Sequence, residues 1–209
     1  MVWYGISYKK EIILYPKVIL IRHGETIWNR EERFQGHLDS TLTEKGEEQA
    51  IENGKKVKKV LDRLDSIKLF SSPLGRAKST ALIVASEIGI SSKDIIFEDR
   101  IKEFNYGILE GKTREYCNKN HYQIMEAREA DKWFYRVENG DSYELVVKRV
   151  KSWLDSLDSN QTIIAVTHEM VNRALRKIYR GISVDEALML RQPNSVVLLL
   201  ENSEEKILT

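Results

Sequence analysis

Two histidines of this chain directly follow short apolar runs that have the character of buried strands. The run 18–21 ends in Arg22 and His23, and the run 162–167 ends in His168. Ligands of open α/β sheets bind beyond the carboxyl ends of the strands, so parallel packing would bring both imidazoles to one edge. A histidine is a competent nucleophile or acid–base group at neutral pH, and a neighbouring guanidinium suits phosphate. The pattern indicates phosphate chemistry without a metal.

Phosphoryl transfer also needs further positive donors and a proton for the departing oxygen. Arg76 lies in the first turns of an expected helix that has Pro73 in its first turn, where backbone N–H groups and the helix dipole favour anions. Glu103, in an irregular segment, is a candidate proton source. The residues alone give no reason to prefer it over Glu98 or Glu110.

Two rival motifs fit less well. The segment 107–113 resembles a phosphate-binding P-loop, but three residues rather than four separate its glycines and no apolar strand precedes it. A metal site could be drawn from acidic and histidine side chains, but no pair has metal-ligand spacing on a helix, and Arg22 beside a dication is unfavourable. The side chains considered for it are His23, Glu25, His37, Asp39 and His168. We therefore expect no metal in the site.

Composition is typical of a globular protein that binds neither nucleic acid nor membrane. The chain has 209 residues, 42% hydrophobic and 31% charged, with a formal net charge of +1, so no global field favours either partner. A single cysteine, Cys117, excludes an internal disulfide. No apolar run approaches the roughly 20 residues of a membrane helix. Lys9, Lys10 and Glu11 argue against a secretory signal. We expect a cytoplasmic protein.

Strand-like and helical patterns alternate along the chain, which predicts the α/β class with a largely parallel sheet. Expected strands cover 17–22, 67–70, 95–97, 162–167 and 196–200. Expected helices cover 43–64 with Thr43 as N-cap, 74–88, 113–134, 170–179 and 184–190, together with one that a capping box at Asp141 and Glu144 opens and that runs to about Leu157. We expect one domain over 1–209, with 1–16 as an N-terminal extension that could add an edge strand.

Five pieces of the sequence, in order, resemble the histidine phosphatase superfamily, also called the phosphoglycerate-mutase-like family. The resemblance extends from about residue 18 to residue 200. The pieces are Arg22–Thr26 with Trp28 and Asn29; Gln35–Thr43 with Gly46, Gln49 and Ala50; Ser71–Ala77 with Thr80 and Ala81; Glu103–Gly107 with Glu110 and Gly111; and Val166–His168.

The resemblance implies a three-layer α/β/α sandwich, a small helical lid at about 112–139 and a role for each site residue. It implies a site that uses no metal and no bound organic cofactor, apart from the phosphorylated primer of mutases. The implied roles are His23 as the phosphorylated residue; Arg22, Arg76, His168 and Asn29 as the phosphate pocket; Glu103 as general acid and then base; and Gln35, Gly36 and Tyr106 as substrate contacts.

Within this family, the phosphatase branch is favoured over the mutases. Family mutases carry a longer insertion after the acid glutamate and usually have Gly-Asn after the second histidine, whereas here Glu169 and Met170 follow. The piece 35–37 also resembles the phosphatase branch. We expect a phosphomonoester hydrolase that acts on a small phosphorylated metabolite through a phosphohistidine.

Two alternatives stay open at this level. One is a phosphoglycerate mutase that interconverts 2- and 3-phosphoglycerate, for which Arg114, Arg128 and Lys132 could bind the carboxylate. The other is a non-catalytic phospho-ligand-binding protein, against which the presence of both histidines and Glu103 argues. A homodimer also stays open, because no sequence feature reports the oligomeric state.

Overall fold

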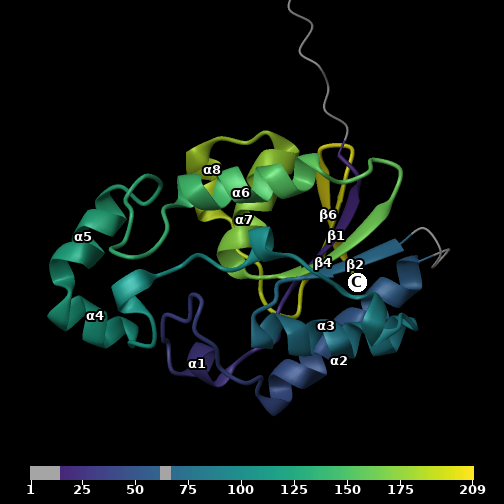
Figure 1. Ribbon diagram of the computed structural model, residues 1–209, viewed down its shortest axis with the longest axis horizontal. Coiled ribbons are helices and arrows are strands. Elements are labelled where there is room, and N and C mark those ends of the chain that lie inside the picture. The colour runs from purple at the N-terminus through teal and green to yellow at the C-terminus, as the bar shows by residue number, and fades with distance from the viewer. Residues whose placement is uncertain (1–14, 62–66) are drawn as a thin grey trace, which may run out of the picture.

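The computed structural model describes residues 15–61 and 67–209, and these residues build a six-stranded mixed sheet (Figure 1). The sheet order is β3-β2-β4-β1-β5-β6. The first four strands of that order are mutually parallel, whereas β5 runs antiparallel to β1 and β6 antiparallel to β5. The strands are β1 (Lys17–Arg22), β2 (Ile67–Ser71), β3 (Ile96–Phe97), β4 (Thr162–Thr167), β5 (Val197–Glu201) and β6 (Glu204–Leu208). The predicted α/β class with a mostly parallel sheet is confirmed.

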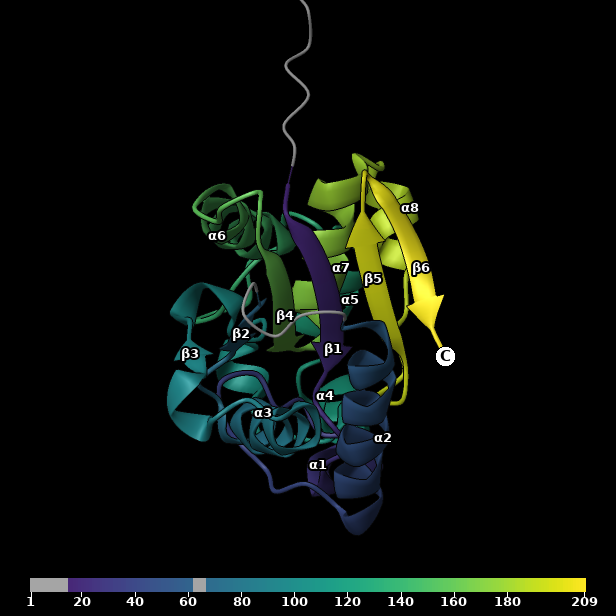
Figure 2. The same ribbon diagram turned by 90° about the vertical axis from the view of Figure 1, so that its right-hand side faces the viewer.

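Helices cover both faces of the sheet and complete a three-layer sandwich, as expected (Figure 2). Alternate residues of β1 enter opposite layers, because side chains of a strand point to alternate faces. The helices are α2 (Glu44–Val60) and α3 (Gly75–Ile88) on one face, and α6 (Tyr143–Asp155), α7 (Glu169–Arg180) and α8 (Val184–Met189) on the other. Val18 and Leu20 belong to the core cluster shared with α6 and α7, while Ile19 and Ile21 belong to the cluster shared with α2 and α3.

The segment after residue 112 stands away from the sheet as two short helices, not one (Figure 1). These are α4 (Arg114–Asn120) and α5 (Tyr122–Ala130), so the prediction of one helix over 113–134 is wrong. His121 separates them with φ −130° and ψ 35°, which is outside the helical region. Thr113 caps α4 by accepting a hydrogen bond from the Tyr116 N–H at 3.1 Å.

Most expected boundaries hold to within a few residues. Thr43 caps α2, as expected; the helix ends at Val60, and the predicted continuation to residue 64 runs into positions outside the described residues. Pro73 precedes α3 rather than lying in its first turn, and Leu74 is the N-cap. The expected capping role of Asp141 is wrong, because Ser142 accepts the hydrogen bond from the Leu145 N–H at 3.3 Å. Residues 1–14 of the expected extension also lie outside the described part.

Several elements have no counterpart in the sequence-based assignment. The final strand β6 forms a hairpin with β5 through Asn202 and Ser203, both of which have positive φ angles of 52° and 63°. Residues 204–208 are mostly polar, so no apolar pattern indicated this strand. The others are α1 (Ile27–Arg30) and three 3-10 turns, Ser92–Asp94, Asp99–Ile101 and Gly107–Leu109. In the two described ranges, no helix combines the length and apolar character that crossing a membrane requires.

Two glycines in contact fix the loop that follows β1. A Cβ atom built on Gly24 would lie 2.1 Å from the carbonyl oxygen of Gly46, and one built on Gly46 would lie 2.1 Å from the Glu25 oxygen. Both neighbours are backbone atoms, which cannot rotate away. The Gly24 N–H also donates to Thr80 Oγ1 at 3.0 Å. The loop that carries His23 is thereby held against the start of α2 and against α3.

We expect Gly24→Ala to lower the free energy of unfolding by about 3 kcal/mol, at the upper end of the cost of overpacking, because the backbone must move. Denaturant titration measures it. Gly181→Ala is the matched control: Gly181 has φ +67° and no atom within 4 Å of the methyl group that alanine would add, so it should cost only the left-handed backbone penalty of about 1 kcal/mol. Equal costs for both variants would contradict the close-contact explanation.

Candidate active site

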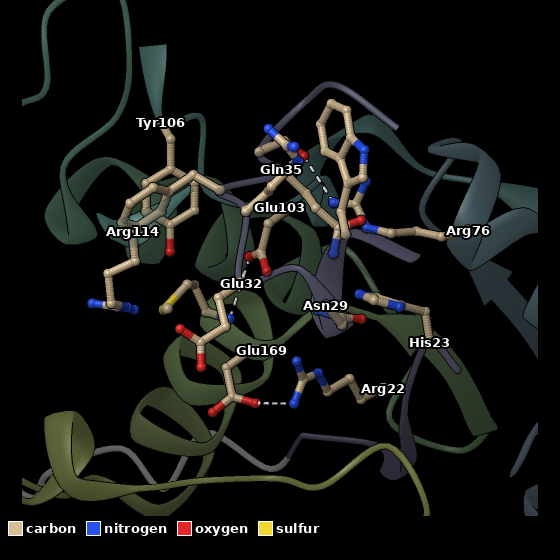
Figure 3. Close-up of a pocket in the computed structure, with 15 residues that line it drawn as sticks. Arg22, His23, Asn29, Glu32, Gln35, Arg76, Glu103, Tyr106, Arg114 and Glu169 are labelled. Atoms are coloured by element: carbon tan, nitrogen blue, oxygen red, sulfur yellow. Dashed lines mark hydrogen bonds and ion pairs between the residues drawn. The ribbon is translucent and has the colours of Figure 1, made fainter. Parts of the chain in front are cut away.

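One pocket at the carboxyl edge of the sheet gathers the residues expected from the sequence (Figure 3). Eight of the nine predicted site residues line it, and the ninth, His168, is fully buried with its ring centroid 5.2 Å from that of His23. The eight are Arg22, His23, Asn29, Gln35, Gly36, Arg76, Glu103 and Tyr106. The pocket has a volume of about 260 Å³, which suits a small phosphorylated molecule.

The pairing of β1 with β4 brings the two histidines together. The strands are parallel and in register, Arg22 lying opposite Thr167, and the His23 N–H donates to the Thr167 carbonyl at 3.0 Å. The imidazole centroids of His23 and His168 are 5.2 Å apart. The expectation that both rings meet at one edge of the sheet is confirmed.

His23 has the protonation state that a nucleophile needs. Its Nδ1 lies 2.8 Å from the Gly24 carbonyl oxygen, which can only accept, so Nδ1 carries the proton and Nε2 keeps its lone pair. Burial, followed by the positive charges of Arg76 and Arg22, holds the pKa of His23 well below its usual 6.5. The ring is therefore neutral at physiological pH.

Arg76 is almost fully buried, at 2% exposure, and is held by the loop that precedes α2. Its Nη1 donates to the Leu38 carbonyl at 2.9 Å and pairs with Asp39 at 3.2 Å, and its Nη2 donates to the Gly36 carbonyl at 2.8 Å. Asp39 also accepts the Arg76 backbone N–H at 3.2 Å. Asp39 is thus a cap and an anchor for the arginine rather than a group that faces the pocket.

Buried polar atoms without a protein partner concentrate at this site. Seven such side-chain atoms occur among the described residues, and five of them belong to the predicted site. They are Arg22 Nε, Arg76 Nε, both ring nitrogens of His168 and Gln35 Oε1. Since a buried donor without a partner costs about 1–3 kcal/mol, such a cluster is expected where a ligand supplies the acceptors. Donors from two arginines and a histidine suit an anion.

Glu103 differs from its sequence neighbours in its burial. Its Oε1 accepts hydrogen bonds from the Phe104 N–H at 2.9 Å and the Met170 N–H at 3.3 Å. Burial raises the pKa of this carboxyl, although the Phe104 N–H and the charges of Arg76 and Arg22 act in the opposite direction. By contrast, Arg100 lowers the pKa of Glu98. Glu103 is therefore the carboxyl able to hold a proton at the pocket wall.

The expected substrate contacts line the pocket, from the segment that follows β1 and from the 103–110 segment (Figure 3). Asn29 is tied to the start of α1, where its Oδ1 accepts the Thr26 N–H at 3.1 Å. Gly36 has φ +54° and presents its carbonyl to Arg76. Tyr106 is buried against Phe34 with ring centroids 4.8 Å apart. Their chemical roles stay predictions.

Several pocket residues were not among the nine predicted ones. Glu169, noted in the sequence only as a departure from mutases, forms an ion pair with Arg22 at 2.7 Å (Figure 3). Its position directly after His168 was the available signal. The remaining lining residues are Trp28, Glu32, Arg33, Phe34, Arg114 and Met170.

A second, basic pocket of about 460 Å³ adjoins the first and shares part of its wall, including Arg22 and Glu169. Besides Arg22, its cations come from α4, from α5 and the residues that follow it, from α7 and from the chain before β5: Arg114, Arg128, Lys132, Arg173 and Arg191. Arg128 is 4% exposed and lies over the rings of Tyr106 and Phe104, at 5.3 and 5.7 Å. Within the described ranges no hydrogen bond or ion pair engages its side chain, and its contacts to charge-stabilising groups are those with the two rings.

The described residues contain no group of three or more histidine, cysteine, aspartate or glutamate side chains placed to hold a metal ion. The residues that line the pocket supply imidazole, guanidinium and carboxyl groups. A neutral imidazole can attack, two guanidinium groups can hold an anion, and a protonated carboxyl can supply a proton.

Comparison with known proteins shows the family of this chain. A family model described as histidine phosphatase superfamily (branch 1) matches residues 18–208. A protein of Erwinia tasmaniensis named probable phosphoglycerate mutase GpmB is 31% identical over 191 residues, covering 90% of this chain and 86% of its own length. Its Escherichia coli namesake is 32% identical over 200 residues, with the same coverage.

Solved structures show the same fold. The alpha-ribazole phosphatase of Shigella flexneri matches with a TM-score of 0.76 at 23% identity, over 91% of this chain and 94% of that one. YhfR of Bacillus stearothermophilus matches with a TM-score of 0.75 at 26% identity, over 92% and 95%. Sequence, fold and pocket thus lead to one assignment: the chain belongs to the histidine phosphatase superfamily.

Proposed function

We propose that this chain is a metal-independent phosphomonoester hydrolase that acts on a small phosphorylated metabolite through a phosphohistidine. The observation that carries the proposal is the neutral His23 ring, with its Nε2 lone pair free, among partnerless donors of Arg22, Arg76 and His168. These donors match the equatorial oxygens of a phosphoryl group under attack.

The first step transfers the phosphoryl group to the enzyme. His23 Nε2 attacks phosphorus and forms the N–P bond while the P–O bond to the alcohol breaks, and Glu103 gives its proton to the departing alkoxide. Burial raises the pKa of Glu103, which favours the protonated form that this step uses. In the second step the Glu103 carboxylate takes a proton from water, the water oxygen attacks phosphorus, and the N–P bond breaks, returning the lone pair to Nε2. Inorganic phosphate leaves.

Arg22 and Arg76 act in both steps. They neutralise the phosphoryl oxygens in a buried site where fixed donors are strong, and loss of one such donor typically costs about 3 kcal/mol in the transition state. Their positive charge also keeps His23 unprotonated before attack. Asn29, Gln35, Gly36 and Tyr106 are proposed to contact the substrate, because they line the same pocket.

Phosphoglycerate mutase is the second candidate. The names of the GpmB relatives favour it, and so does the basic pocket, which contains Arg114, Arg128 and Lys132 next to the proposed phosphate site. The hydrolase is preferred because Glu169 and Met170 follow the second histidine, where family mutases usually have Gly-Asn.

A panel of phosphorylated metabolites tests the proposal, scored for free phosphate and for isomers. 3-Phosphoglycerate is assayed with and without a bisphosphorylated primer. We expect phosphate release without primer, and no inhibition by EDTA. Primer-dependent isomerisation that exceeds phosphate release would establish the mutase instead. If no phosphate is released from any ester, including p-nitrophenyl phosphate, the result would favour the alternative of a non-catalytic phospho-ligand-binding protein. Strong inhibition by EDTA would contradict the metal-free mechanism.

Arg128 has no carboxylate partner among the described residues, which leads to a prediction about substrate preference. Esters with a second anionic group should have a lower KM than neutral esters of similar size, because that group can pair with Arg128. We expect Arg128→Met to remove about tenfold of this preference, a magnitude typical of one charge-assisted hydrogen bond. The ratio of kcat/KM for glycerol phosphate and 3-phosphoglycerate measures it. Lys119→Met, on the exposed side of α4, is the control, and an unchanged ratio for Arg128→Met would contradict the prediction.

A further inference from the structure

Glu169 is the one pocket carboxylate to which the proposed reaction assigns no step and that contacts a phosphate-binding arginine directly. It is the first residue of α7, directly after His168, and it lines both the catalytic pocket and the basic pocket. Its Oε2 pairs with Arg22 Nη1 at 2.7 Å, and only 14% of its side chain is exposed. A carboxylate in this place would ordinarily compete with phosphate for the arginine.

The geometry of Arg22 gives the carboxylate a different effect. Arg22 Nη1 is shared by Glu169 and by the Gln192 carbonyl, which accepts at 3.0 Å. The Nε atom is buried without a protein partner, and no hydrogen bond engages Nη2 among the described residues. In a planar guanidinium, Nε and Nη2 form the side-on fork that binds phosphate through two parallel hydrogen bonds. The Glu169 carboxylate therefore pairs with Nη1, the one guanidinium nitrogen of Arg22 that does not belong to this fork.

The other carboxylate oxygen of Glu169 faces a second arginine, Arg173. Its Oε1 lies 3.4 Å from Arg173 Nη2, one helical turn along α7. Arg173 is 3% exposed and donates from Nε and Nη2 to the Leu190 carbonyl at 3.1 and 2.8 Å. The segment 190–192 thus binds both arginines through backbone carbonyls: Gln192 accepts from Arg22, and Leu190 accepts from Arg173. Glu169 pairs with both arginines. Such an arrangement restricts the rotamers of a long side chain that is otherwise free to turn.

We propose that Glu169 is a positioning residue that turns the Nε–Nη2 fork of Arg22 toward the phosphoryl group. The inference rests on the proposed phosphate pocket. It does not need turnover, because phosphate affinity alone reports on it. Glu169 contributes no bond to the substrate and acts through Arg22.

The sign of the effect on phosphate binding separates positioning from competition. Removing a carboxylate that only competes or repels must strengthen the binding of an anion, because like charges disfavour it. Removing one that orients Arg22 must weaken it. We expect Glu169→Ala to weaken the binding of inorganic phosphate about tenfold, measured by calorimetric titration at neutral pH. Glu169→Gln keeps an oxygen that can accept from Nη1, so we expect it to bind phosphate at least as tightly as the parent chain.

A second pair of variants tests whether the effect passes through Arg22. In the Arg22→Ala background we expect Glu169→Ala to change phosphate affinity by less than about twofold, since no fork remains to be oriented. Glu144→Gln, an exposed first-turn glutamate of α6, is the matched control and should bind phosphate as the parent does. Should Glu169→Ala not fold, Glu169→Met, which fills similar space without an acceptor, takes its place.

Unchanged or tighter phosphate binding by Glu169→Ala would overturn the inference, as would a weakening of the same size in the Arg22→Ala background. These outcomes are independent of catalysis. A chain that hydrolyses phosphomonoesters and binds phosphate more tightly without Glu169 keeps the proposed function and loses this inference. A chain that hydrolyses no ester but shows the expected affinities loses the function and keeps the inference.

Discussion

Replacing His23 by alanine is expected to lower the turnover of p-nitrophenyl phosphate by about 10,000-fold or more, the usual consequence of removing a nucleophile. In the proposed reaction, Nε2 of this ring forms the only covalent bond between enzyme and substrate. Its lone pair is available because Nδ1 is bound to the Gly24 carbonyl. The ring of His168 is fully buried, has its centroid 5.2 Å away and is not among the residues that line the pocket, so we expect that it does not replace His23.

Acid quenching during turnover gives a direct measurement. The parent chain should carry acid-labile phosphate on residue 23, detectable by ³¹P NMR or by mass spectrometry after rapid digestion. His23→Ala should carry none. His121→Ala, at the junction of α4 and α5 away from the pocket, is the matched control and should behave as the parent does. Acid-labile phosphate on His168, or its persistence in His23→Ala, would show that the nucleophile is misassigned.

Local sequence patterns were sufficient for the strands that position this nucleophile. The apolar runs before Arg22 and His168 are fully buried on both faces, as strands in the middle of a parallel sheet are. Their carboxyl ends necessarily meet once the strands pair in parallel. The same reasoning failed for β6, because an edge strand is exposed and its polar residues 204–208 carry no burial signal.

Partners distant in sequence could not be predicted from local patterns. The carbonyl of Gln192 that holds Arg22 comes from a segment 170 residues away. From the sequence, Arg128 is only a possible carboxylate contact, and the packing of α5 against Tyr106 shows that it is buried. The family resemblance indicates Glu103 as the proton source, whereas the residues alone give Glu98 and Glu110 as equally good candidates. Burial, a tertiary property, is what separates them.

Glu103→Gln gives the second large expected effect, and its size should depend on the leaving group. Glutamine keeps an oxygen for the Phe104 and Met170 N–H groups but has no proton to transfer. For an alkyl ester such as glycerol phosphate, whose alkoxide needs that proton, we expect kcat/KM to fall by about 100- to 10,000-fold. For p-nitrophenyl phosphate, whose leaving group departs readily as an anion, we expect a much smaller fall in kcat/KM, which reports the first step.

The pH dependence follows from the same group. Burial raises the pKa of Glu103, so its protonated form persists above the ordinary range of a carboxyl group, and kcat/KM for the alkyl ester should decline only as pH rises through that elevated pKa. The charged groups that act on this carboxyl are Arg76, Arg22, Arg149 and Glu169. In Glu103→Gln that alkaline decline should disappear.

Glu98→Gln is the matched control for this experiment. Glu98 lies five residues earlier and, with its pKa lowered by Arg100, stays ionised, so its loss should change kcat/KM by less than about twofold on either ester. The ratio of the two esters then isolates proton transfer from other damage, because a distorted pocket slows both substrates alike. Equal losses on glycerol phosphate and p-nitrophenyl phosphate in Glu103→Gln would mean that this carboxyl only anchors the Phe104 and Met170 backbone and that the proton comes from another group.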